Sequence, residues 1–218
     1  MPNCLRSKCN IPHKIVLLTI IFVFLHVGSV VAQCIEGNCR DGTGTLSLPD
    51  GRKYSGKFEG SRMTGFGVME FLGVICEGNF HCGVPYGYLK FKYPDGKIYL
   101  GEYSDGKRNG NGMLSYPDGT RYEGEFKDGK FNGKGTLCFQ DGTRYVGNFK
   151  DNRFNGHGKV FLSDGSVYAA QFKKGRTKGN VTSPVNDRTG GFREENEGGK
   201  VKLKNFVLES TLNSEKEG

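Results

Sequence analysis

Apolar and polar residues alternate in short runs along the middle of the chain. The clearest example is the pair of segments 133–139 (GKGTLCF) and 143–149 (TRYVGNF), which flank the three residues QDG. Alternation with a period of two predicts two half-buried β-strands. A three-residue connection that ends in Gly is typical of a β-hairpin with a left-handed last loop residue. This loop would place Leu137 opposite Tyr145, so that one face carries Tyr, Leu, Phe and Gly and the other face is polar.

The same hairpin pattern recurs at regular intervals. The motif Tyr-x-Gly-x-Phe begins at residues 54, 76, 99, 122, 145 and 168, in steps of 22 or 23 residues, and Gly-x-Gly and Asp-Gly follow it in most copies. Such spacing indicates a stacked repeat architecture. A single hairpin is only marginally stable, so neighbouring units are expected to share one sheet. We therefore predict an all-β fold: an elongated single-sheet ribbon of stacked antiparallel β-hairpins, with about six repeats of about 23 residues.

Two features of the repeats set expectations for their packing. Glycine inside a strand is normally a weakness, but here the glycines would leave room for aromatic rings to lie over bare backbone. The second unit departs from the pattern, because Cys76 replaces the tyrosine and Leu72-Gly73 replaces the Asp-Gly turn. We expect the ribbon to bend or break at this unit.

Composition narrows the class of protein further. The 218 residues include 35 Gly, 16 Phe and 10 Tyr but no Trp. This is too much glycine for a helical bundle and too much aromatic residue for a disordered chain. The chain also lacks the long aliphatic strands of a parallel α/β core.

The first 32 residues have a different character. Three basic residues, Arg6, Lys8 and Lys14, precede an 18-residue apolar run, which ends in small residues before Gln33. This order is typical of a cleaved signal peptide. The run is also long enough for a retained membrane anchor, and a buried core helix is the third interpretation. We predict an N-terminal hydrophobic signal or anchor helix at residues 1–32. The protein is then exported (periplasmic, cell-surface or secreted), with a single-pass membrane-anchored protein as the alternative.

Two further segments follow the leader. Residues 33–180 hold the repeat ribbon. Residues 181–218 are polar, and we expect a disordered tail there. Within the tail, residues 201–208 (VKLKNFVL) alternate in part and are compatible with one strand.

The sequence lacks the common motifs of catalysis and of cofactor or metal binding. It has no Gly-x-x-x-x-Gly-Lys-Ser/Thr phosphate loop, no calcium loop, no Cys-x-x-Cys and no Gly-x-Ser-x-Gly. Beyond residue 32 the only histidines are His81 and His157, and His81 with Cys82 supplies too few ligands for a zinc site. We therefore predict no enzyme activity, no cofactor and no metal.

Cysteine spacing favours one disulfide. Cys34 and Cys39 are close in sequence across a plausible turn, and in an exported protein they are expected to pair. Cys76 and Cys82 lie too far apart along one predicted strand to pair with each other. Cys138 is expected on the polar face.

The charge of the chain is basic. The formal net charge is +8, and residues 33–180 hold 22 Lys and Arg against 16 Asp and Glu. A basic surface favours anionic partners. We predict no nucleic-acid partner, because the aromatic residues that could stack bases are needed in the core. The candidate contacts to anionic lipid are Lys127, Lys130, Lys134, Lys173, Lys174 and Arg176.

The order and phase of Tyr-x-Gly-x-Phe, Gly-x-Gly and the Asp-Gly turn resemble the MORN (membrane occupation and recognition nexus) repeat family. The resemblance covers residues 37–179. It implies stacked β-hairpins in an elongated ribbon. It also implies scaffolding, self-association and, for some members, contact with acidic phospholipids, without catalysis by the repeats.

Three functions are compatible with these observations. The first is a non-catalytic exported scaffold that binds a protein partner or self-associates. The second is peripheral binding to anionic membrane surfaces through basic loops. The third, with the least support, is an enzyme acting on an envelope polymer. For the scaffold, the candidate binding face consists of Tyr54, Tyr99, Tyr122, Phe126 and Tyr145, and packing in the core is the alternative role for these side chains.

Overall fold

The computed structural model describes residues 31–178. The predicted leader at residues 1–32 lies outside this range except for its last two residues. The polar tail at residues 181–218, with its possible strand at 201–208, also lies outside the described residues.

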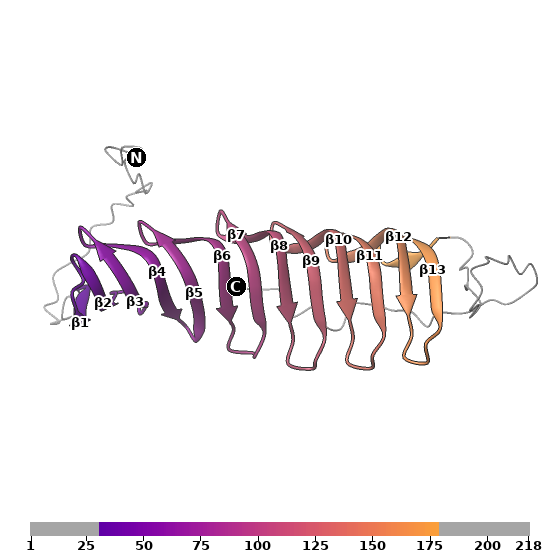
Figure 1. Ribbon diagram of the computed structural model, residues 1–218, viewed down its shortest axis with the longest axis horizontal. Coiled ribbons are helices and arrows are strands. Elements are labelled where there is room, and N and C mark those ends of the chain that lie inside the picture. Colours follow the sequence, from indigo (N-terminus) through magenta and orange to yellow (C-terminus); the bar gives the residue numbers. More distant parts are fainter. Residues whose placement is uncertain (1–30, 179–218) are drawn as a thin grey trace, which may run out of the picture. The chain divides into compact units, whose positions relative to one another are not determined.

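The described residues form one antiparallel sheet of fourteen strands, and each strand pairs with the strands that precede and follow it in the chain (Figure 1). This arrangement confirms the all-β, single-sheet ribbon of stacked hairpins. Residues 31–178 contain strands and turns but no helix. The strands are β1 (Gln33–Gly37), β2 (Gly42–Ser47), β3 (Lys53–Glu59), β4 (Arg62–Phe71), β5 (Val74–His81), β6 (Val84–Lys92), β7 (Ile98–Ser104), β8 (Lys107–Ser115), β9 (Arg121–Lys127), β10 (Lys130–Cys138), β11 (Arg144–Lys150), β12 (Arg153–Phe161), β13 (Val167–Lys173) and β14 (Arg176–Thr177).

The register predicted from the alternating pattern is confirmed. Leu137 on β10 lies opposite Tyr145 on β11, and the inner glycines of the two strands also lie opposite each other. In the three-residue loop between them, the N–H of Phe139 donates to the carbonyl of Thr143 at 2.8 Å. Gly142 closes the loop with φ +85°, a left-handed conformation that glycine adopts without steric cost.

The opposite edge of the ribbon has a different turn. Between β9 and β10 only Asp128 and Gly129 are unpaired, with φ values of 51° and 81°. Positive φ at both central residues defines the tight turn whose twist matches that of the strands. The same two-residue turns occur at 60–61, 82–83, 105–106, 151–152 and 174–175. From β2 onward, three-residue loops therefore line one edge of the ribbon, with an exception at residues 72–73, and two-residue turns line the other.

The second unit does not break the ribbon. Leu72 and Gly73 form a two-residue turn, with φ values of 48° and 78°, on the edge where the other units have three-residue loops. The shorter turn accounts for the step of 22 residues. Strands β4, β5 and β6 remain paired through this unit, because the ladder needs backbone groups and not the missing tyrosine ring. The expected break was therefore wrong.

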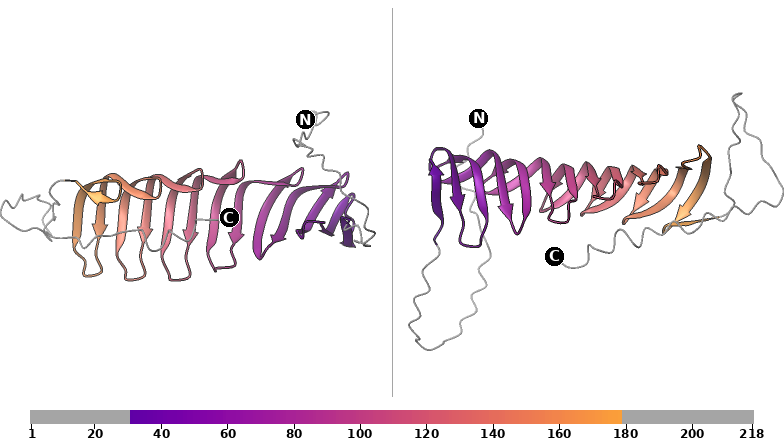
Figure 2. Two further views of the ribbon diagram at one scale, coloured as in Figure 1. Left: turned by 180° about the vertical axis from the view of Figure 1, so that it is seen from behind. Right: turned by 90° about the horizontal axis from the view of Figure 1, so that it is seen from below.

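A single sheet forms a core here because its hairpins are bent. The ring centroids of Tyr54 and Phe58 are 5.3 Å apart, although four residues of straight strand would separate them by about 13 Å. The register between β3 and β4 shifts after Gly56, where Gly65 on β4 has φ +59°. A bulge of this kind bends a strand and increases its twist. The hairpin ends with two-residue turns therefore curve over one face of the sheet (Figure 2).

Aromatic rings fill the space under these curved ends. Tyr145 stacks on Phe154 at a centroid distance of 3.8 Å and packs edge-on against Phe149 and Phe172. A methyl group added to Gly158 would lie 2.5 Å from the ring carbon Cε2 of Tyr145. This confirms that the strand glycines leave room for rings.

Candidate interaction surfaces

The five aromatic residues predicted as a binding face lie in the core. Tyr54, Tyr99 and Tyr122 have no exposed surface, and Tyr145 and Phe126 are 1% and 4% exposed. Packing in the core, the alternative that the sequence left open, is therefore their role in the structure. A partner cannot reach these side chains while the ribbon is folded.

The tyrosine hydroxyls are used within the ribbon. Tyr99 donates to the backbone carbonyl of Glu102 at 2.6 Å, and Tyr145 donates to that of Asn148 at 3.0 Å. Burial raises the pKa of both hydroxyls above the ordinary value for tyrosine. These groups therefore stay protonated and hold the bend in the strand that carries them.

Exposed aromatic residues gather instead around β4 and β6. Phe66 and Tyr88 are each 60% exposed, Val84 is 60% exposed and Tyr86 is 50% exposed. Phe66 and Tyr86 both lie opposite Asn79 of β5, which separates them. Gly67 and Leu89, which follow Phe66 and Tyr88 in the chain, are buried, so the side chains of Phe66 and Tyr88 leave the sheet on the face opposite to the core. We call these four residues the outer patch.

The outer patch is confined to one region of the repeat array. Phe66 and Tyr88 occupy the middle position of the Gly-x-Gly motif, whose second glycine is Leu89 in the unit of Tyr88, and in other units this middle position is polar. The positions of Tyr86 and Val84 are likewise polar or basic elsewhere. The residues at these positions in the later units are Asn111, Lys134 and His157 for Phe66 and Tyr88, Asn109, Asn132 and Asn155 for Tyr86, and Lys107, Lys130 and Arg153 for Val84. A position-by-position comparison of the repeats would have found this patch from sequence.

The basic candidates divide between two places. Lys127 and Lys130 flank one two-residue turn, and Lys173, Lys174 and Arg176 surround a later turn on the same edge. Lys134 lies on β10 beyond the bulge, opposite Asn148 of β11. The six residues therefore do not form one surface, and five of them follow the edge with two-residue turns.

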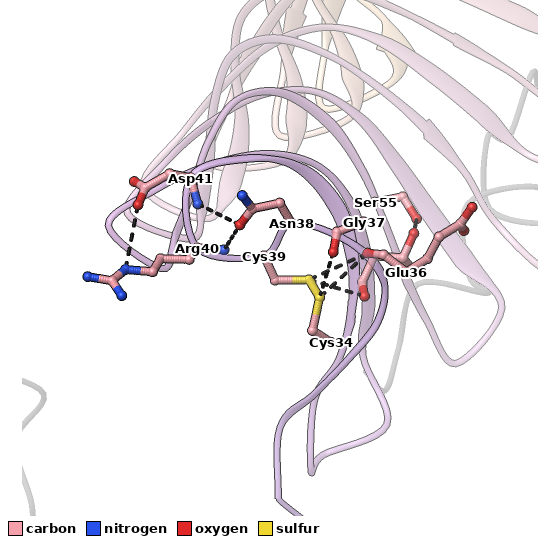
Figure 3. The surroundings of a disulfide bond; sticks show 9 residues. Cys34, Glu36, Gly37, Asn38, Cys39, Arg40, Asp41 and Ser55 are labelled. Atoms are coloured by element: carbon pink, nitrogen blue, oxygen red, sulfur yellow. Dashed lines mark hydrogen bonds and ion pairs between the residues drawn. A yellow bond between two sulfur atoms is a disulfide. The ribbon is translucent and has the colours of Figure 1, made fainter.

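The predicted cysteine pair lies at the first hairpin of the ribbon (Figure 3). Cys34 and Cys39 form a disulfide with Cα atoms 5.8 Å apart. Asn38, between them, accepts hydrogen bonds from the backbone N–H groups of Arg40 and Asp41, both at 3.0 Å. The crosslink ties β1 to the connection that precedes β2.

The other three cysteines of the described region are free thiols. Cys76 is buried, and Cys82 and Cys138 are partly exposed. Burial raises the pKa of the Cys76 thiol to about 12, so it stays a protonated core group at neutral pH.

Residues 31–178 contain no group of three His, Cys, Asp or Glu side chains placed to hold a metal ion. Within the same residues, no helix is long and apolar enough to cross a membrane.

The fold and its repeated hairpins define a β-hairpin repeat protein. The family model of the MORN repeat matches residues 54–71, 99–121, 122–144 and 145–167. These four stretches of the ribbon are therefore repeats of the MORN family. The matches leave out residues 72–98, the stretch that carries Val84, Tyr86 and Tyr88.

Other comparisons give only distant similarity. No curated protein matches the chain. One similar solved structure is the SAS-4 (dCPAP) TCP domain of Drosophila melanogaster in complex with a proline-rich motif of Ana2. Its sequence identity with this chain is 16% and the TM-score is 0.40, and the alignment covers 78% of this chain and 97% of that one. The CPAP G-box domain is 17% identical with a TM-score of 0.36, covering 66% and 82%. Similarity at this level indicates no shared function.

Proposed function

We propose that the chain is a non-catalytic interaction scaffold that binds a protein partner through the outer patch. The observation that carries this proposal is the presence of exposed aromatic and aliphatic side chains in one region, at repeat positions that are polar in the other units. Contiguous exposed apolar residues mark interaction sites, and tyrosine is enriched among the residues that dominate binding energy. The rigid ribbon would fix their spacing before binding.

The repeats supply substitutions that test this role without disturbing the fold. Phe66→Asn, Tyr86→Asn and Tyr88→Asn give the patch residues that other units carry on the same backbone. Crosslinking in extracts of the source organism measures which partner the protein binds. We expect the triple variant to fold as the unsubstituted protein does and not to crosslink to the partner that the unsubstituted protein captures. His157→Asn changes a matching position outside the patch and should keep the partner. Equal recovery of that partner by all three proteins would contradict the proposal.

The partner in this proposal is either a different protein or a second copy of the chain. Sedimentation of the purified full chain separates the two. A dimer that the triple variant converts to monomer identifies self-association. A monomer at all concentrations leaves a different protein as the partner.

A second candidate function is peripheral binding to anionic membranes. The five basic side chains along the two-residue-turn edge favour it, because a linear row of cations suits a flat anionic surface. Binding to vesicles that contain anionic lipid should weaken as salt rises and should fall in Lys173→Gln/Lys174→Gln/Arg176→Gln. Lys134→Gln, a change off this edge, is the control. Binding that is absent, or insensitive to salt, contradicts this function.

Export is also part of the proposal. The basic start, apolar run and small residues before Gln33 support it. N-terminal sequencing of the protein from its native cells tests it. A mature chain that starts near residue 33 in an extracytoplasmic fraction would agree, as would an uncut chain in the membrane fraction, which corresponds to the anchored alternative. A full-length chain in the cytosol would contradict export.

A further inference from the structure

The edge with two-residue turns carries a ladder of ion pairs between successive hairpins. The ammonium group of Lys107 lies 3.4 Å from a carboxylate oxygen of Asp128 in the next turn. One unit further along, Lys130 lies 3.9 Å from Asp151. In both cases, the basic residue after one turn contacts the first residue of the following turn.

The ladder lacks its acidic partner at the last turn. Arg153 occupies the position of Lys107 and Lys130, but the first residue of the following turn is Lys174. Lys174 has φ 52°, the same left-handed conformation as Asp128 and Asp151. The backbone is therefore unchanged, and only the sign of the charge is reversed.

This reversal leaves a group of cations at the C-terminal end of the edge. Lys150 and Arg153 lie opposite each other in one hairpin, and Lys173 and Arg176 lie opposite each other in the next. All are exposed, and none forms an ion pair with an acidic side chain among residues 31–178. We call the five residues Lys150, Arg153, Lys173, Lys174 and Arg176 the basic turn cluster.

We propose that the basic turn cluster binds the acidic segment Glu194–Glu197 of the same chain. The segment has the sequence Glu-Glu-Asn-Glu and supplies three carboxylates. It would provide the negative charge that the ladder has at Asp128 and Asp151 and lacks at Lys174. Charge complementarity between the cluster and this segment is the first argument for the pairing.

Chain length is the second argument. The last described residue, Lys178, lies beside the cluster, because its N–H donates to the carbonyl of Gln171 on β13. Glu194 follows Lys178 by sixteen positions in the chain, and a chain of that length spans up to about 55 Å. Adjacent hairpins of the cluster are only about 10 Å apart. The tether therefore reaches both hairpins and keeps the segment at a high effective concentration.

An intramolecular contact of this kind would compete with any external anion for the same cations. It does not depend on a protein partner at the outer patch or on membrane binding. If membranes do bind this edge, loss of the acidic segment should strengthen that binding, so the two functions can be tested separately.

Zero-length carbodiimide crosslinking of the purified full chain tests the contact. We expect crosslinks from Glu194, Glu195 or Glu197 to Lys150, Lys173 or Lys174, with a yield that does not change over an about tenfold range of protein concentration. The yield should fall severalfold as salt rises to about 0.3 M. Lys174→Asp gives the last turn the residue type of the three turns before it and should reduce crosslinks to Lys150 and Lys173 at least about threefold. Lys134→Asp makes the same charge change away from the cluster and should leave them unchanged.

A second measurement reads the cluster directly. Acetylation of Lys150 and Lys173 should be about twofold faster or more in Glu194→Gln/Glu195→Gln/Glu197→Gln than in the parent. Glu209→Gln/Glu215→Gln/Glu217→Gln removes the same charge from the end of the chain and should have no effect. The proposal is overturned if the segment crosslinks to Lys200, Lys202 or Lys204 instead, if the yield rises with protein concentration, or if acetylation rates match in all proteins.

Discussion

Gly158→Ala is the substitution for which the structure makes the sharpest prediction. Gly158 lies on β12, opposite Gly147 of β11, and the ring of Tyr145 covers both glycines. Gly158 is not among the residues with positive φ, so alanine meets no backbone strain there. On backbone entropy alone, Gly→Ala at such a position stabilises a protein by about 0.4–1 kcal/mol. The packing of Tyr145 predicts the opposite sign.

The size of the effect follows from the contacts. The added Cβ would lie 2.5 Å from Cε2 and 2.6 Å from Cζ of Tyr145, so the ring must withdraw by about 1 Å to reach normal contact. Overpacking of this kind costs about 1–3 kcal/mol. The Tyr145 hydroxyl would also lose its hydrogen bond to the carbonyl of Asn148, which is 3.0 Å long, and this loss costs about 0.5–1.5 kcal/mol more. After the entropic gain, we expect a net destabilisation of about 1–3 kcal/mol.

Urea unfolding of the full chain, followed by circular dichroism, measures this change. Ala170, which lies opposite Gly158, takes in the last unit the position that Gly147 has in the preceding one. Ala170→Gly is the control, with an expected cost of at most about 1 kcal/mol. Gly158→Ala should also be less harmful in a Tyr145→Leu background, where the ring is absent. If Gly158→Ala is neutral or stabilising, the ring does not depend on bare backbone and the reasoning fails.

Two further predictions concern pH and the disulfide. Burial raises the pKa of Tyr99, Tyr122 and Tyr145 above the usual value of about 10. Above that pH the unfolded chain therefore holds fewer protons than the folded one, and the urea concentration at the midpoint of unfolding should fall as pH rises. A midpoint that stays constant between about pH 9 and 11 would contradict this. Reduction of the Cys34–Cys39 disulfide removes a stabilisation of about 2 kcal/mol. Because repeats couple mainly to their neighbours, the loss should be confined to the first hairpin. Amide exchange should therefore quicken in residues 33–47 and stay unchanged in residues 121–161, and uniform quickening along the ribbon would refute the local role.

Much of the fold was predictable because the repeat combines two periods. The two-residue alternation sets the faces, and the three-residue loop then fixes Leu137 opposite Tyr145. The bend was not predictable from these patterns, because a bulge at Gly65 or Gly133 depends on positive φ, which the sequence does not reveal. The two-residue turns were missed for a related reason: Asp151-Asn152 and Lys174-Gly175 have no single signature, yet their backbones match that of Asp128-Gly129.

The candidate site was harder to predict than the fold. Conspicuous tyrosines such as Tyr99 suggested a binding face, but the bent hairpins bury them. The outer patch was visible only as a departure from the repeat, since Tyr88 stands where Lys134 and His157 stand in other units. In a repeat protein, residues common to all units maintain the ribbon, and residues peculiar to one unit are the better candidates for binding.

Photo-crosslinking from two equivalent positions tests the central claim most directly. A photoreactive amino acid replaces Tyr88 in one protein and Lys134 in another, so the probe leaves the same face of the same repeat position in both. The interaction scaffold predicts a discrete crosslinked partner, either another protein or a second copy, from position 88 and none from position 134. Equal crosslinking from the two positions, or crosslinking from position 134 alone, would contradict the assignment of binding to the outer patch.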